Sequence, residues 1–119
     1  SATVALRNLA RTGKSDQGRL HALWALDGLG ELNDEDLLSG LGDKSPGVRE
    51  NALRLAEPRL KQSPALLNRV VSLAADVDAR VRFQAAFSLG EQPDARAFDA
   101  LAALELEDDA LQQVEDRTN

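Results

Sequence analysis

The chain has 119 residues, which is enough for one domain, and a folded chain of this length buries about two thirds of the surface that the unfolded chain exposes. Its 14 basic and 20 acidic side chains give a net charge of −6, which argues against nucleic-acid binding because the phosphate backbone would repel the chain. The absence of cysteine excludes disulfide bonds, thiolate metal sites and cysteine nucleophiles.

The composition favours helices. Leucine and alanine supply most of the 43% hydrophobic fraction, and both lose little side-chain entropy in a helix. No stretch alternates with a period of two, so we predict an all-α fold without strands. No run of about 18 apolar residues occurs, so no membrane insertion is expected. The opening SATVALRNLA is already helical in spacing and lacks an initiator methionine, so we interpret the chain as a segment of a larger protein.

Capping residues and glycines divide the chain into eight predicted helices. Helices are expected to start after polar residues, two of which precede proline (Ser45-Pro46 and Ser63-Pro64). Glycines at positions 13, 30, 42 and 90 are expected to close helices in the left-handed conformation. The predicted helices span residues 2–12, 16–29, 34–41, 46–61, 64–75, 79–90, 94–104 and 107–117, with Pro58 kinking the fourth.

Apolar residues recur at helical spacing within these segments and predict their buried faces. In the second helix the stripe consists of Ala22, Leu23, Ala25, Leu26 and Leu29. In the fifth helix it consists of Leu66, Leu67, Val70, Val71 and Ala74.

A repeat organises the chain. An arginine followed three residues later by alanine, with a further apolar residue at the next position, recurs at Arg19, Arg49 and Arg82. The alternate helices start at positions 34, 64 and 94, so one unit is a helix pair of about 30 residues. Stacked helix pairs form an α-solenoid. We therefore predict a right-handed α-α superhelix of about four pairs, with repeats at 1–30, 33–62, 63–91 and, in part, 93–119.

The residues that precede two of these arginines give the pattern a family resemblance. Asp43 and Asp76 stand six residues before Arg49 and Arg82, and an aspartate followed by Val-Arg-x-x-Ala resembles the HEAT-repeat pattern. The tetratricopeptide pattern of Trp, Gly, Tyr and Pro is absent. The resemblance implies a ladder of hydrogen bonds and ion pairs between repeats, formed by these four residues.

The first unit departs from the family pattern. It has glycine at the positions of the aspartate and the valine (Gly13 and Gly18). Arg19 still occupies the ladder position, and in the absence of an aspartate at position 13 we expect Asp16 to be its partner.

A closer resemblance is carried by GRLHALWALDGLGELNDEDLLSGLGDKSPGVRENALRLAEP and DARVRFQAAFSLGE. These segments are similar to the HEAT segment of large bacterial membrane-bound dehydrogenase-like proteins that combine a β-propeller, HEAT repeats and a cytochrome c domain. The resemblance implies a helical spacer, located outside the cytoplasm if the parent is exported; the compartment is otherwise undetermined. Any redox chemistry of such a parent would reside in the other domains, since no Cys-x-x-Cys-His occurs here.

The chain offers few residues for catalysis or metal binding. His21 is the only histidine, and neither Gly-x-Ser-x-Gly nor a phosphate-binding glycine loop occurs. Asp108 and Asp109 could offer oxygen ligands to a hard cation, but adjacent helical residues point about 100° apart, so we interpret them as a solvated acidic tail. We expect no enzymatic activity, no catalytic or metal-binding residues and no cofactor.

Charge is distributed unevenly along the chain. The first 19 residues contain four basic residues and one acidic residue, Asp16, whereas residues 105–116 contain six acidic residues and no basic one. Opposite charges at the two ends could dock neighbouring domains or copies of the chain, and the alternative is a solvated surface. The basic residues are Arg7, Arg11, Lys14 and Arg19, and the acidic residues are Glu105, Glu107, Asp108, Asp109, Glu115 and Asp116.

A helical wheel of the second helix of each pair suggests a binding surface. Positions one, two and five residues after the repeat arginine point away from the core centre, and second helices generally line the concave side of a solenoid. Large aromatic and arginine side chains are typical anchors of protein interfaces. The predicted protein-binding strip consists of His21, Trp24, Arg54, Gln84 and Phe87.

Two alternatives remain open at this stage. Large side chains at the strip positions could instead pack between the two helices of a pair. The function predicted from the strip is a non-catalytic scaffold or spacer whose partner is a protein or a neighbouring domain of the same chain. The alternative function is small-molecule binding or enzymatic activity in a groove around His21 and Trp24.

Overall fold

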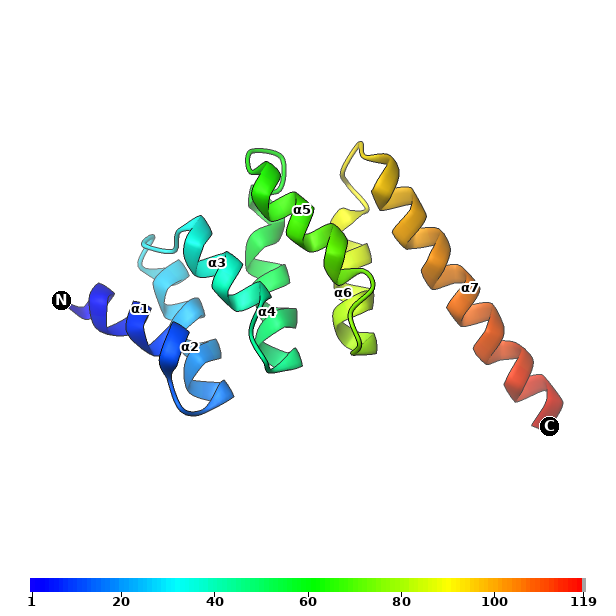
Figure 1. The fold of residues 1–119 in the computed structure, drawn as a ribbon, viewed down its shortest axis with the longest axis horizontal. Coiled ribbons are helices and arrows are strands. Elements are labelled where there is room, and N and C mark those ends of the chain that lie inside the picture. Colours follow the sequence, from blue (N-terminus) through cyan, green and yellow to red (C-terminus); the bar gives the residue numbers. More distant parts are fainter. Residues whose placement is uncertain (119) are drawn as a thin grey trace.

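The computed structural model describes residues 1–118, which form seven α-helices and one short 3-10 helix, with no strand among them (Figure 1). The predicted all-α class is therefore confirmed. The elements are α1 (Ala2–Thr12), α2 (Asp16–Gly28), α3 (Asp34–Leu41), α4 (Pro46–Ala56), η1 (Glu57–Arg59), α5 (Pro64–Leu73), α6 (Ala79–Leu89) and α7 (Ala95–Thr118).

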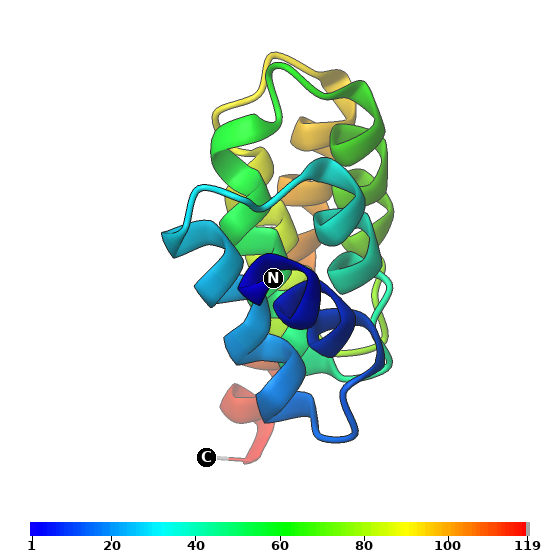
Figure 2. The same ribbon diagram turned by 90° about the vertical axis from the view of Figure 1, so that its left-hand side faces the viewer.

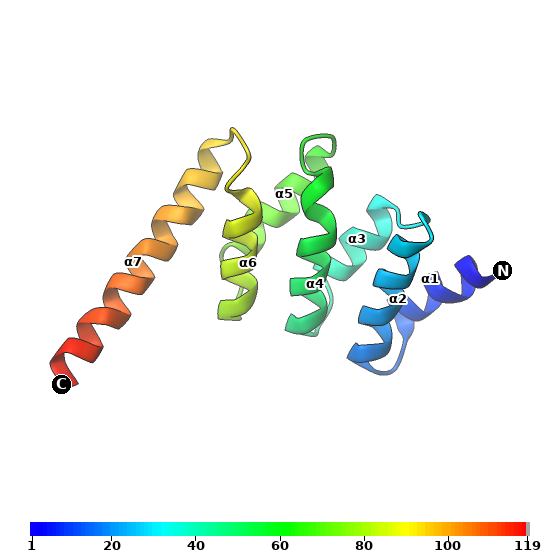
Figure 3. The ribbon, with the colours of Figure 1, turned by 180° about the vertical axis from the view of Figure 1, so that it is seen from behind.

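The helices lie in two layers. Figure 1 shows α1, α3 and α5 in front, and the reverse view shows α2, α4 and α6 as a second row (Figure 3). The view along the solenoid shows the two layers side by side (Figure 2). The second helices pack on one another more extensively than the first helices do, so the second row forms the inner side of the curve. The helix α7 packs on α5 and α6 and completes a molecule of 57 × 32 × 18 Å.

The core between the layers repeats at intervals of 30 residues. Ala10, Gly40, Val70 and Ala100 follow one another at this interval, and all four are buried. A Cβ atom on Gly40 would lie 3.0 Å from the Cβ of Ala52 and 3.0 Å from a methyl group of Leu23, so glycine allows α3 to approach α2 and α4 closely. Most other core positions are leucine, valine or alanine.

The helix ends follow from local chemistry, with one correction. Asn33 caps α3 through a capping box in which Asn33 and Asp36 each accept a hydrogen bond from the main-chain amide of the other. Among residues 1–118, only Gly30 has a positive φ, of 71°. The prediction that Gly13, Gly42 and Gly90 also close helices in the left-handed conformation is wrong, because all three have negative φ values.

Two predicted helix boundaries and one predicted core face also differ from the structure. The helix α4 ends at Ala56 and continues as η1, because Pro58 has no amide hydrogen to extend the α-helical ladder. The two helices predicted at 94–104 and 107–117 form one helix, α7, so residues 1–118 form three pairs and a single long helix. In α2, Ala25 and Leu29 are exposed, since α2 ends at Gly28 and its buried stripe stops at Leu26.

No glycine, proline or capping signal separates Leu104 from Glu107. The intervening Leu-Glu-Leu-Glu sequence consists of good helix formers, which is why α7 runs on without a break.

Candidate functional site

A ladder of arginine and aspartate side chains connects successive helix pairs. Arg19 Nε and Nη2 donate to the two carboxylate oxygens of Asp43 at 2.8 and 3.0 Å. Arg49 Nε and Nη2 donate to Asp76 at 3.0 Å each. Each arginine also donates from Nη1 to the main-chain oxygen six residues earlier, that of Gly13 or Asp43, at 2.8 Å. Every step of the ladder therefore joins one turn to the next.

The two ends of the ladder depart from the sequence-based expectation. Arg19 was expected to pair with Asp16, but its hydrogen bonds go to Asp43, because the aspartate of the following unit completes each step. Arg82 pairs with a glutamate instead of an aspartate, donating to Glu107 of α7 at 2.6 Å. The hydrogen bonds to Asp43 and to Glu107 raise the pKa of Arg19 and of Arg82.

A second charged cluster joins the outer helices α1 and α3, and sequence reasoning missed it. The carboxylate of Asp36 is fully buried and accepts hydrogen bonds from Arg7 Nε at 3.0 and 3.1 Å and from Arg11 Nη2 at 3.2 Å. Burial would raise the pKa of Asp36, but the hydrogen bonds from Arg7, Asn33 and Arg11 outweigh burial, and the pKa is lowered. The Asn-x-x-Asp capping box was visible in the sequence, whereas the two arginines come from 25 and 29 residues away.

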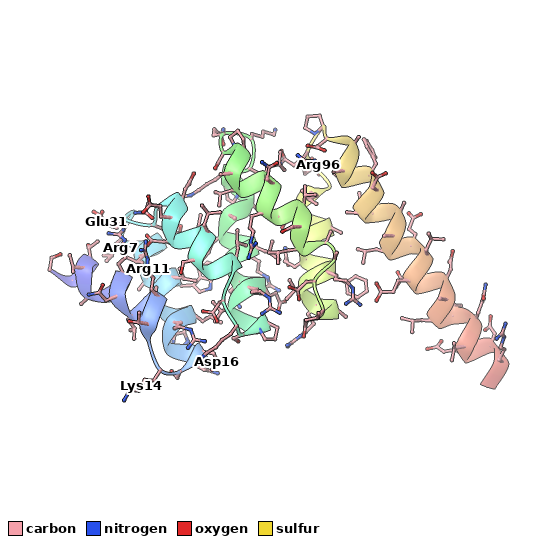
Figure 4. The ribbon with its side chains drawn as sticks, viewed as in Figure 1. Arg7, Arg11, Lys14, Asp16, Glu31 and Arg96 are labelled. Atoms are coloured by element: carbon pink, nitrogen blue, oxygen red, sulfur yellow. The ribbon has the colours of Figure 1, made fainter. Side chains whose placement is uncertain are left out.

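These contacts leave little free positive charge at the N-terminal end. Arg7 and Arg11 form ion pairs with Asp36, and Arg19 forms one with Asp43. Figure 4 shows that Arg7 and Arg11 lie close to each other on α1. Of the four basic residues at this end, only Lys14 has no ion pair with a residue in 1–118. The proposed docking by opposite charges at the two ends thus loses most of its basic component, although the acidic residues of α7 other than Glu107 are exposed.

A polar hollow of about 360 Å³ lies beside this end of the ladder, where α1 and α3 finish. Its basic side chains stand near the carbonyl ends of two helices, where positive charge is favourable. We therefore attribute them to stabilisation of the helix ends. The lining residues are Arg11, Thr12, Gly13, Arg19, Ser39, Gly42, Asp43 and Lys44.

The predicted strip lies across α2, α4 and α6, the three helices of the inner row (Figure 3). Trp24 Nε1 donates to the side-chain oxygen of Asn51 on the next helix at 3.1 Å. Arg54 Nε donates to the side-chain oxygen of Gln84 at 3.3 Å, and its Nη2 donates to Glu50 at 3.1 Å. Side chains of neighbouring second helices are therefore connected along the inner face.

The aromatic side chains of this face are exposed to different degrees. Trp24 is 42% exposed, Phe83 is 38% exposed and Phe87 is 75% exposed, so none of them is buried between the helices of a pair. Phe83, which was outside the predicted strip, and Phe87 line a shallow hollow of about 300 Å³ between α4 and α6. The other lining residues are Glu50, Arg80 and Gln84.

His21 is exposed at the α2 end of the strip, and its imidazole makes no hydrogen bond with any residue in 1–118. Among these residues, no group of three or more histidine, aspartate or glutamate side chains is placed to hold a metal ion. None of the helices described has the length and apolar character needed to cross a bilayer.

The comparison with known families agrees with the repeat geometry. The family model described as HEAT repeats matches residues 35–115, which is more than half of the chain. The chain belongs to the HEAT-repeat family. The match runs from α3 into α7, so the pair α1–α2 lies outside it although Arg19 joins the same ladder. No match was found among curated proteins or solved structures.

Proposed function

We propose that this HEAT-repeat chain is a non-catalytic scaffold that binds a protein, or a neighbouring domain of the same chain, on the inner face formed by α2, α4 and α6. The observation that carries the proposal is the partial exposure of Trp24, Phe83 and Phe87 on this single row of helices. Exposed aromatic residues on one face of a folded protein are typical of interaction sites, and Trp is enriched among the residues that contribute most to binding energy.

The inner face is also held in place before a partner arrives. Trp24 is fixed by its hydrogen bond to Asn51, and Arg54 is fixed between Glu50 and Gln84. Side chains that are already ordered lose less conformational entropy on binding, so more of the contact energy appears as affinity. The rigid stack of helix pairs positions these side chains at the spacing of the repeats.

The alternative, a small-molecule or enzymatic groove around His21 and Trp24, has less support. Neither residue lines any of the three hollows described for this structure. The hollow that strip residues do line, at Gln84 and Phe87, is shallow and lies between α4 and α6, away from His21 and Trp24 on α2.

The resemblance to the HEAT segment of dehydrogenase-like proteins supports a more specific form of the proposal, in which this chain is the spacer between a β-propeller and a cytochrome c domain of an exported bacterial protein. The amino-acid sequence that flanks this segment in its gene product tests whether the chain is such a spacer. Propeller repeats upstream and Cys-x-x-Cys-His downstream support it, and the lack of both contradicts it.

The binding role is tested with a double variant, Trp24→Ala with Phe87→Ala. Both side chains are substantially exposed, so the variant should fold, which circular dichroism checks. The natural partner or adjoining domain should bind the double variant at least about tenfold more weakly in isothermal titration, as expected for two interface anchors. Val77→Ala, at a loop position that is 93% exposed, is the control and should bind normally. Equal affinity of the double variant and the control would refute the strip.

A further inference from the structure

A hollow of about 450 Å³ opens at the edge of the solenoid where the turn after η1 faces the turn between α6 and α7. It shares no residue with the strip on the inner face. Its lining residues are Leu60, Lys61, Leu67, Glu91, Gln92, Pro93 and Asp94.

Gln92 is the unusual residue of this hollow. It is only 8% exposed, and its side-chain amide makes no hydrogen bond with any part of the chain that the structure describes. Every side-chain nitrogen or oxygen that is completely buried in the described residues has a hydrogen-bond partner. The amide of Gln92 has none, so it is not completely buried and must reach the open space of the hollow. The amide of Gln92 therefore offers one donor group and one acceptor oxygen to a molecule that enters the hollow.

Residues that differ by a multiple of 30 occupy equivalent positions in the stacked helix pairs. This equivalence identifies the group that lies at the position of the hollow near the N-terminal end of the solenoid. Arg7 on α1 and Leu67 on α5 are equivalent by this register, and so are Glu31 and Glu91 in the turns that they face. At the first position, Arg7 Nη2 donates to the main-chain oxygen of Glu31 at 2.6 Å, as the two residues labelled in Figure 4 show. At the later position a leucine stands in place of the arginine, and the main-chain oxygen of Glu91 has no donor among the described residues.

The register also explains why the later position offers no guanidinium of its own. The equivalent of Asp36, the carboxylate that holds Arg7, is Arg96. Arg96 donates instead to both oxygens of Asp94, at the rim of the hollow, and to Asn68. The hollow is thus the counterpart of a site that the chain fills with an arginine at its other end.

The lining groups suit the same kind of side chain. Glu91 is exposed and has no ion pair in the described part of the chain, so its carboxylate, its main-chain oxygen and the oxygen of the Gln92 amide are available acceptors. Asp94 is already held by Arg96, and Lys61 is the one basic residue in the lining. Leucine and proline walls fit the methylene stem of a long cationic side chain.

We propose that this hollow receives an arginine side chain from a partner polypeptide, with the guanidinium donating to Glu91, as Arg7 donates to Glu31, and to the side-chain oxygen of Gln92. A planar guanidinium with several fixed donors can satisfy separate acceptors at once, which a single ammonium does less well. The proposal does not depend on the strip, because the two surfaces have no residue in common.

The direct test is a nuclear magnetic resonance titration of the full chain with the acetylated and amidated peptide Gly-Leu-Arg-Leu-Gly. The Gln92 side-chain amide and the Leu67 methyl groups should shift with saturation at millimolar peptide. Replacing arginine by citrulline, its neutral isostere, should weaken binding at least about tenfold, and lysine should also bind more weakly. Shifts of equal size with citrulline, or none with arginine, would overturn the proposal. Tighter binding of free L-arginine than of the peptide would overturn the choice of a polypeptide.

Variants separate the site from general effects of the peptide. Gln92→Leu restores the residue type found at the equivalent Leu32, and it should weaken the arginine peptide at least about tenfold while raising the midpoint of thermal unfolding. Glu91→Gln, at an exposed position, should weaken binding without affecting folding. Gln17→Leu, an exposed glutamine on α2, is the matched control and should bind normally. Unchanged affinity in Gln92→Leu would contradict the site, whereas loss confined to Trp24→Ala with Phe87→Ala would assign the peptide to the strip.

Discussion

Arg19 of α2 is bound by both nitrogens of its fork to Asp43 of the next helix pair, with Nε 2.8 Å from Oδ2 and Nη2 3.0 Å from Oδ1. Its residue surface is 4% exposed, and its third nitrogen reaches the main-chain oxygen of Gly13. One side chain therefore ties α2 to the turn before it and to the turn between α3 and α4, and the same geometry recurs at Arg49. The ladder is the feature that fixes the spacing of the pairs and, through it, the spacing of the strip.

Arg49→Ala should lower the free energy of unfolding by about 3 kcal/mol, because it leaves Asp76 nearly buried without its partner. Urea unfolding followed by circular dichroism measures the change. Arg80→Ala is the control, since the Arg80 side chain is 66% exposed and only 3.5 Å from Asp78, and it should change stability by less than about 0.5 kcal/mol. Similar losses in the two variants would show that the ladder is not special.

Acid should destabilise the chain through Asp36 and Asp43. Burial opposes ionisation of both residues, but the hydrogen bonds from Arg7 and Arg19 outweigh it, so both pKa values are lower in the folded state. The unfolded state then takes up protons first as the pH falls. The stabilisation is complete above the unfolded value of about 4 and is lost as the pH falls through the folded values. Urea midpoints measured across this range should be flat near neutral pH and drop below about pH 4.

The variant Asp36→Asn separates this carboxylate from the others. It should be less stable than the native chain at neutral pH and should lose less stability on acidification, since it has one fewer group to protonate. An acid loss as steep as that of the native chain would mean that Asp36 contributes nothing to the pH dependence.

Substituting alanine for Gly28 and for Gly30, two positions apart, should change the stability of the chain in opposite directions. Gly28 lies in α2, and a Cβ atom there would have open space, so Gly28→Ala should raise stability by about 0.5–1 kcal/mol. Gly30 has the same open space but a φ of +71°, so Gly30→Ala should lower stability by about 1 kcal/mol. Thermal unfolding of both variants compares the two signs directly, and a gain at position 30 would contradict the left-handed turn.

The second half of α7 should contribute little to stability. Residues 108–117 are exposed, whereas Ala97 and Ala100 are buried and Glu107 pairs with Arg82. Removing residues 108–119 should therefore cost less than about 1 kcal/mol. Removing residues 95–119 should cost about 3 kcal/mol or more, because it uncovers the apolar faces of α5 and α6. Equal losses in urea unfolding would place the stabilising contacts beyond Glu107.

The sequence was sufficient to predict the class, the pairs and the ladder register, because these depend on periodicity and on local capping. It was not sufficient to predict that α7 is one continuous helix. The only indication was that no glycine, proline or capping residue ends the helix near position 105, and such an absence is weaker evidence than a residue that does end a helix. It also placed Arg19 with the nearby Asp16, because a partner 24 residues away is visible only when the stack is built. The Asp36 cluster was missed for the same reason.

Exposure at the strip could not be decided from the helical wheel. The wheel placed Trp24 and Phe87 away from the core centre, but it could not show whether the neighbouring helix covers that side. In the structure Phe87 is 75% exposed, and the α4 residue that lines the same hollow is the polar Glu50. Equally, the wheel had no means of showing that Gln92 lacks a partner, since that depends on two turns that meet only in the stack.

The proposed binding of a protein on the inner face is tested most directly by photo-crosslinking. A photoreactive phenylalanine analogue is placed at Phe87 on α6 and, in a separate sample, at the exposed Ala65 on α5 of the outer layer. In its native setting, the chain labelled at position 87 should give a discrete crosslinked product with a partner or adjoining domain, and the chain labelled at 65 should not. Crosslinking at 65 alone, or to an equal extent at both positions, would contradict binding on the inner face.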